Sequence, residues 1–155
     1  MCSLHLILDT SSRQSNQGSI CNFLFQFDKL NIENYKKIKL NSFYIQHESD
    51  AQKVFHDPLD NDANKSLAPL HVHCSLLNKD YNFFNWKKSD IMAVIYPTLH
   101  SQKAYMTNVL IKIDNSDFKL ISTCSYMQLK LTHSNNSIVE KRGKFYIVYE
   151  IEFSQ

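Results

Sequence analysis

The sequence predicts an all-β fold, and three observations support this. Phe and Tyr, which favour strands, occur 10 and 8 times among 155 residues. No long stretch shows the 3.6-residue apolar period of a helix. Eight segments instead alternate apolar and polar residues or are rich in aromatic residues: 4–9, 22–28, 38–46, 70–77, 90–96, 104–113, 125–132 and 145–153. Eight strands in a chain of this length predict a sandwich of two sheets.

The first four segments each carry side chains that a core can bury. The third has apolar residues on both faces, which predicts a central strand. In the other three, the apolar residues alternate and share one face: Leu4, Leu6 and Leu8; Phe23, Phe25 and Phe27; and Leu70, Val72, Cys74 and Leu76. This two-residue period is that of a half-buried strand.

The last four segments follow the same rule. Pro97 ends the fifth, and Tyr105, Val109, Ile111 and Ile113 are mostly in phase in the sixth. Met127, Leu129 and Leu131 are expected to point inward from the seventh. The eighth has one apolar face, and its other face carries Glu150 and Glu152. We expect these two carboxylates to blunt an edge strand or to face a neighbouring subunit.

The connections are polar, and Asn supplies much of the turn chemistry because only two Gly are present. The expected elements between strands are a loop at 10–21, a turn or one helical turn at 31–37, a long loop at 47–68 with a short helix near 50–55, a turn-rich stretch at 78–89, a loop or edge piece at 118–121 and a hairpin connection at 133–144. The prediction is one domain, residues 1–155, folded as an eight-stranded single jelly roll with short helical turns in its loops. An immunoglobulin-like sandwich fits less well, because no paired cysteines flank a buried tryptophan.

The net charge and the cysteine spacing indicate which classes of partner and which cellular compartment to expect. The net charge is +2 and no block of Lys and Arg exceeds two residues, so we expect no specific nucleic-acid binding. The first strand begins at Leu4, and we therefore expect no basic arm for packaging a genome. The four cysteines are widely spaced without a CxxC pair, and no secretory signal is visible, which predicts reduced thiols in the cytosol or nucleus. No apolar stretch is long enough to insert into a membrane as a helix.

His71 and His73 are the weak candidates for a metal site. Two residues apart on a strand, they point to the same side and could share an ion if a third ligand came from another strand. The alternative is an outward or interface face opposite Val72 and Cys74. We favour that alternative, because further ligands are not visible and a metal site needs its full set.

Two other stretches carry polar residues of the kinds found in catalytic or calcium sites. Asp9 to Arg13 places hydroxyls beside a carboxylate, but without a nucleophile elbow we expect a turn in which Asp9 or Thr10 caps backbone amides and Arg13 pairs locally. The acidic stretch 57–62 lacks the spacing of a calcium loop. Two glycines cannot build a phosphate-cradling loop. We therefore expect no enzyme activity and no cofactor.

Phe83, Phe84 and Trp86 form an aromatic cluster in the turn-rich stretch. They could stack on a base or a sugar, but few cations flank them, which disfavours nucleic acid. We expect them to pack a loop or to contact another subunit.

Two groups of segments resemble capsid proteins. The segments LILDTSSR (6–13), FLFQF (23–27) and KIKLNSF (37–43) resemble the opening of small capsid proteins of large DNA viruses. HVHCSLL (71–77) and NFFNWKKSDIMAVIYP (82–97) are similar to the penton, or vertex, proteins of Polintons, adintoviruses and virophages. With the order of the strands, the resemblance covers most of the chain. Trp86 departs from it, because a glycine is expected in that turn.

The resemblance implies a minor capsid protein that forms homopentamers and closes the fivefold vertices of an icosahedral virion. Its neighbours would be trimers of a double jelly-roll major capsid protein, and it would assemble in the host cytoplasm or nucleus. We expect no appended receptor or enzyme domain. Two alternatives remain: a lectin-like, glycan-binding sandwich using Trp86, Phe83 and the 47–68 loop, and a pentameric histone chaperone, which the absence of a long acidic tract disfavours.

Overall fold

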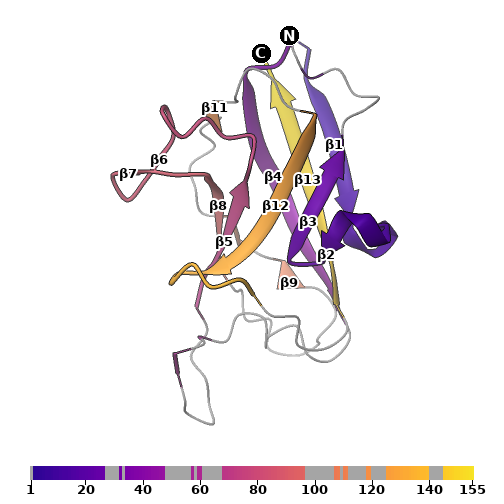
Figure 1. Cartoon of the computed structure of the whole chain (residues 1–155), viewed down its shortest axis with the longest axis vertical. Helices are drawn as coiled ribbons and strands as arrows, with labels where there is room; N and C mark the ends of the chain where they lie inside the picture. The colour runs from indigo at the N-terminus through magenta and orange to yellow at the C-terminus, as the bar shows by residue number, and fades with distance from the viewer. Residues whose placement is uncertain are drawn as a thin grey trace.

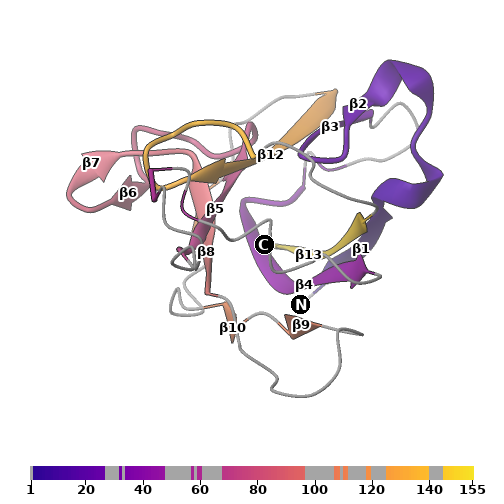
Figure 2. The same ribbon diagram turned by 90° about the horizontal axis from the view of Figure 1, so that it is seen from below.

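The computed structural model describes residues 2–26, 32, 34–47, 57, 59–60, 68–96, 107–108, 110–111, 118–119, 125–139 and 145–155. These residues are mostly β, with two short 3-10 helices and no α-helix among them. Two antiparallel sheets lie face to face (Figures 1 and 2). The all-β prediction is confirmed.

The first sheet has two long central strands. β13 (Phe145–Ser154) pairs with β4 (Lys37–His47) along its whole length, with a register shift between Glu150 and Ile151. β1 (Leu4–Asp9) is the edge strand on the β13 side. β9 (Thr107–Asn108) and β11 (Phe118–Lys119) both pair with the other side of β4.

The second sheet has β5 and β12 at its centre. Its order is β10 (Leu110–Ile111), β8 (Ile91–Tyr96), β5 (Leu70–Cys74), β12 (Tyr126–His133), β3 (Asn22–Gln26) and β2 (Gly18–Ser19). A separate two-stranded hairpin, β6 (Phe83–Phe84) and β7 (Lys87–Lys88), projects from this sheet (Figure 2).

The inner faces of the two sheets form one apolar core. Met127, Leu129 and Leu131 are fully buried, as their alternation predicts. Ile147, Tyr149, Ile151 and Phe153 are also fully buried on the facing sheet. Phe43 of β4 meets Tyr149 of β13 edge to face, with ring centroids 5.4 Å apart. This geometry adds about 0.5–1.5 kcal/mol to the effect of burial.

Some predicted elements differ in the structure. The fourth strand ends at Cys74, three residues early, because a turn follows in which Leu77 N donates to Cys74 O. The sixth is divided between the sheets, with β9 on β4 and β10 on β8. The piece at 118–121 is an edge strand of two residues, β11. The expected helix near 50–55 lies outside the described residues.

The prediction that Glu150 and Glu152 blunt an edge is wrong. Their strand, β13, pairs with β1 on one side and β4 on the other. The two carboxylates therefore lie on the outer face of the sheet near its middle. Polar residues alternating with a buried face mark which side meets solvent, and they do not distinguish an edge strand from a central one.

The expected loop after β1 is more ordered than predicted. It forms two 3-10 helices, η1 (Thr10–Ser12) and η2 (Ser15–Gln17). Asp9 Oδ1 accepts from Ser11 N at 2.8 Å, and Arg13 donates to Thr10 O at 3.1 Å, which confirms the capping turn. Thr10 is fully buried, and its hydroxyl accepts from Ile147 N and donates to Ile147 O, which anchors the turn to β13.

Replacing Tyr149 with phenylalanine should raise the stability of the fold. The Tyr149 hydroxyl is buried and makes no hydrogen bond within the described part of the chain. Burial raises its pKa, so the group stays neutral and unpaired. Removing it should add about 1 kcal/mol to the free energy of unfolding, measured by urea denaturation. Tyr44→Phe, at an exposed position, is the control and should change little. A less stable Tyr149→Phe variant would show that the hydroxyl has a partner.

Candidate interaction surface

His71 and His73 lie on the outer face of the second sheet, where the chain folds back over them. They alternate with Leu70, Val72 and Cys74, which face the core. The expected position opposite Val72 and Cys74 is confirmed, but the two histidine residues are only 7% and 8% exposed. The chain between β5 and β8 covers this face, and the ring of Phe84 in the hairpin meets His71 edge-on at 5.2 Å.

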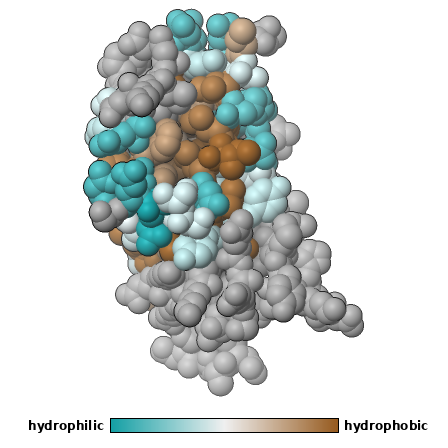
Figure 3. Space-filling model, turned by 90° about the vertical axis from the view of Figure 1, so that its right-hand side faces the viewer, coloured by the Kyte–Doolittle hydropathy of each residue, from teal (hydrophilic) through white to brown (hydrophobic). Residues whose placement is uncertain are grey.

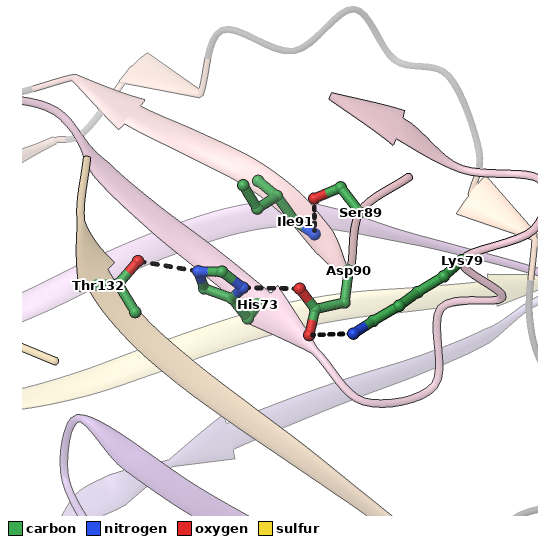
Figure 4. Close-up of polar contacts among 6 residues, drawn as sticks. All are labelled: His73, Lys79, Ser89, Asp90, Ile91 and Thr132. Atoms are coloured by element: carbon green, nitrogen blue, oxygen red, sulfur yellow. Dashed lines mark hydrogen bonds and ion pairs between the residues drawn. The ribbon is translucent and has the colours of Figure 1, made fainter. Parts of the chain in front are cut away.

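His73 joins three segments through hydrogen bonds (Figure 4). Its Nδ1 lies 2.8 Å from Asp90 Oδ1, and its Nε2 lies 2.8 Å from the hydroxyl of Thr132. Since a carboxylate can only accept, Nδ1 carries a proton and donates it to Asp90, while Nε2 shares a hydrogen bond with the Thr132 hydroxyl. The His73 hydrogen bond holds the pKa of Asp90 below its usual range. Lys79 Nζ lies 3.9 Å from the other carboxylate oxygen.

The order hydroxyl, imidazole, carboxylate is that of a serine-hydrolase triad. Here, however, the Thr132 side chain is fully buried in the centre of the sheet. A substrate carbonyl would have to come within about 3 Å of that hydroxyl, which the fold does not allow. The trio is therefore a structural link that fastens β5, β12 and the start of β8.

His71 is held differently from His73. Its Nδ1 is buried and has no hydrogen-bond partner among the described residues. Burial, and then the neighbouring His73, lowers the pKa of His71. No group of three or more His, Cys, Asp or Glu side chains in the described ranges is placed to hold a metal ion. Both nitrogens of His73 are already engaged, so the two rings do not form half of an open metal site.

Acid should destabilise the protein through His71. A buried histidine with a lowered pKa binds its proton more weakly in the folded chain than in the unfolded chain. Stability is therefore fully present above the ordinary pKa of 6.5 and falls as pH drops below it. Asp90 adds a loss at lower pH, through its own lowered pKa.

Melting temperatures measured from about pH 8 to about pH 5, a window that spans the titration range of histidine, test this prediction. His71→Gln should flatten the decline near pH 6, whereas His5→Gln, on the exposed part of β1, should leave it in place. An unchanged decline in His71→Gln would contradict the assignment.

The tip of the hairpin is a two-residue turn in the left-handed region. Asn85 has φ 48° and Trp86 has φ 63°. Positive φ at both central residues is the type I′ pattern, which suits Asn followed by Gly. A bulky residue there is an outlier that costs about 1–3 kcal/mol. The expectation of a glycine at position 86 thus matches the backbone, and local folding does not account for the tryptophan.

Trp86 is also the most exposed large apolar residue that the structure describes, at 99%. Phe83 and Tyr81 nearby are exposed as well, while Phe84 is half-buried against His71. Lys87 and Lys88 follow the turn, and Lys88 pairs with Asp80 at 3.1 Å. The hairpin therefore presents aromatic area and positive charge to the outside, anchored through Phe84.

A second apolar surface lies on the opposite flank of the sandwich. Figure 3 shows apolar atoms gathered on the side along which β1 and β3 run. Ile7 of β1 is 72% exposed on the outer face of the first sheet. Leu4 and Leu6, on the opposite face of the same strand, and Phe25 of β3 are partly buried against the core. β1 is an edge strand, and Ile7 lies directly across from Glu150 of β13.

The predicted site residues thus form two groups. Phe83, Phe84 and Trp86 lie in the hairpin, whose Phe84 ring meets His71 of β5. Glu150 and Glu152 lie elsewhere, on the outer face of the first sheet. Glu150 accepts from Ser42 Oγ at 2.5 Å, and Glu152 lies 3.0 Å from Lys39 Nζ. The Lys39 hydrogen bond, and then that of Asn41, lowers the pKa of Glu152.

Sequence reasoning missed Thr132, Asp90 and Ile7. Thr132 gave no signal of its own in the sequence. It lies on the outer face of β12, and the pairing of β12 with β5 sets it across from His71 and within hydrogen-bond distance of His73. Ile7 did give a signal, because it is apolar at an outward position of its strand.

No protein-family model matches the chain, and no curated protein matches it in sequence. No helix among the described residues is long and apolar enough to cross a membrane.

Proposed function

We propose that this protein is a structural capsid protein that assembles into homopentamers and closes the fivefold vertices of an icosahedral particle, of a DNA virus or a Polinton-like element. Its partners in the particle are trimers of a double jelly-roll major capsid protein. The observation that carries the proposal is the strand order, together with the sequence resemblance to penton proteins.

The strand order supports a single jelly roll. Counted along the chain, the principal strands are β1, β3, β4, β5, β8, the divided β9 and β10, β12 and β13. One sheet has the order first, eighth, third, with β9 of the divided sixth strand and the short β11 also paired to the third. The other has second, seventh, fourth, fifth, followed by β10 of the sixth. Nested pairing of early with late strands is what two Greek keys produce when they close into a jelly roll.

The surface supports assembly. A ring needs a heterologous interface, in which one patch meets a different patch on the next copy. The hairpin with Trp86 and the exposed edge strand with Ile7 are two such patches on different flanks. Neither the strain at Trp86 nor the exposure of Ile7 contributes to the stability of a single chain.

Electron microscopy of the purified protein tests the proposal. Class averages should show rings with fivefold symmetry, and co-expression with the major capsid protein should place these rings at particle vertices. Particles that close without incorporating the protein, together with a chain that stays monomeric at high concentration, would contradict it.

A glycan-binding module is the second candidate, favoured by the exposed aromatic side chains Tyr81, Phe83 and Trp86. Aromatic faces supply apolar stacking area with a polar edge in binding sites. A glycan array separates the two functions: saturable binding that Trp86→Ala abolishes would support this candidate. Fivefold rings that bind no glycan would support the capsid function and exclude the glycan-binding function.

A further inference from the structure

We propose that the β6–β7 hairpin of one copy docks on the β1 edge of the next copy, with Trp86 packed against Ile7 and Lys87 near Glu150. The inference rests on the proposed homopentamer and names the two patches that make its contact. The occupant of the apolar β1 flank is thus a second copy of this chain.

The two patches lie on opposite sides of the sandwich. In Figures 1 and 2 the hairpin projects on one side, and β1 with the adjoining 3-10 helices lies on the other. A contact between opposite flanks repeats from copy to copy and closes a ring when the rotation fits. The placement is that of a head-to-tail interface.

The chemistry of the two patches is complementary. A long edge strand with an exposed apolar side chain invites association unless something covers it, and Ile7 is 72% exposed. Trp86, 99% exposed, is the residue type most often found to dominate an interface. Glu150 lies across from Ile7, so a carboxylate adjoins the apolar site and complements Lys87 of the hairpin.

A contact between two hairpins fits less well. A symmetric interface would bring Lys87 and Lys88 of one copy against the same residues of its partner, and like charges in such a contact are unfavourable. Two β1 edges would likewise bring the carboxylate of Glu150 near the same residue of the partner copy. Docking hairpin on edge avoids both repulsions.

The protein carries its own probe, because Trp86 is its single tryptophan. Tryptophan emission therefore reports the environment of the proposed contact and nothing else. On assembly the emission should shift to shorter wavelength and become protected from a soluble quencher. The same measurement on Ile7→Glu should show an exposed tryptophan at every protein concentration.

Two variants and their mixture test the contact by analytical ultracentrifugation. Trp86→Ala removes the aromatic side chain of the hairpin, and Ile7→Glu places a charge at the apolar position of β1. Each substitution should weaken assembly by at least about 30-fold. Each variant keeps the half that the other lacks, so mixing them should give heterodimers that extend no further. Ile138→Glu changes an exposed residue outside the contact and should assemble normally. Circular dichroism confirms that each variant is folded.

The outcomes separate this inference from the proposed function. Fivefold rings that persist in both variants would overturn the inference and leave the homopentamer standing. Loss of rings in both variants without heterodimers on mixing would also overturn it, because Trp86 and Ile7 would then belong to different contacts. A wild-type chain that forms no rings would overturn the homopentamer itself.

Discussion

Replacing Phe43 with alanine should lower the free energy of unfolding by about 3–5 kcal/mol. Phe43 is 2% exposed and lies between the sheets, edge to face with Tyr149. Removing the ring leaves a cavity bounded by β4 and β13, the longest strand pair of the fold, which cannot close over it. Urea denaturation followed by far-UV circular dichroism measures the loss.

Tyr44→Ala is the matched control on the same strand. Its side chain points to the outer face and is 36% exposed, so its removal should cost less than about 1 kcal/mol. Comparable losses in the two variants would contradict the register in which Phe43 faces the core and Tyr44 faces outward.

Replacing His73 with alanine should have the next largest effect, a loss of about 3 kcal/mol. The change removes both hydrogen bonds of the imidazole ring, so the buried hydroxyl of Thr132 and the carboxylate of Asp90 each lose their hydrogen bond to His73. An unpaired buried polar group costs its full desolvation penalty. Denaturation at pH 8, where His71 is neutral, isolates this loss from the acid effect.

A double variant tests the mechanism behind that loss. His73→Leu with Thr132→Val replaces a paired polar contact by apolar side chains and should recover part of the stability. His5→Ala is the control at an exposed position and should be close to neutral. Equal losses for His73→Ala and for the double variant would mean that packing, rather than hydrogen bonding, holds this face.

The alternation of apolar residues predicted the core well because it follows from strand geometry alone. Met127, Leu129 and Leu131 each point inward as expected, and so do Ile147, Tyr149, Ile151 and Phe153. Strands 125–132 and 145–153 were displaced by only one residue at some ends. Local turns were also predictable, since Asp9 caps the turn that its sequence suggests.

Pairing between distant strands was not predictable from local pattern. Glu150 lies in the middle of a sheet because β1 returns to pair with β13, and nothing near Glu150 in the sequence signals this. The buried setting of His71 depends on Phe84 in a hairpin that folds back over it. The division of the sixth strand depends on which sheet each half meets. The resemblance to penton proteins led us to expect a glycine at position 86, which agrees with the left-handed backbone of Trp86.

Sedimentation equilibrium of the purified wild-type chain tests the central claim most directly. The homopentamer predicts a species of about 91 kDa, five times the chain mass of 18.2 kDa, with smaller species only on dilution. A single species of 18.2 kDa at all accessible concentrations would contradict the account.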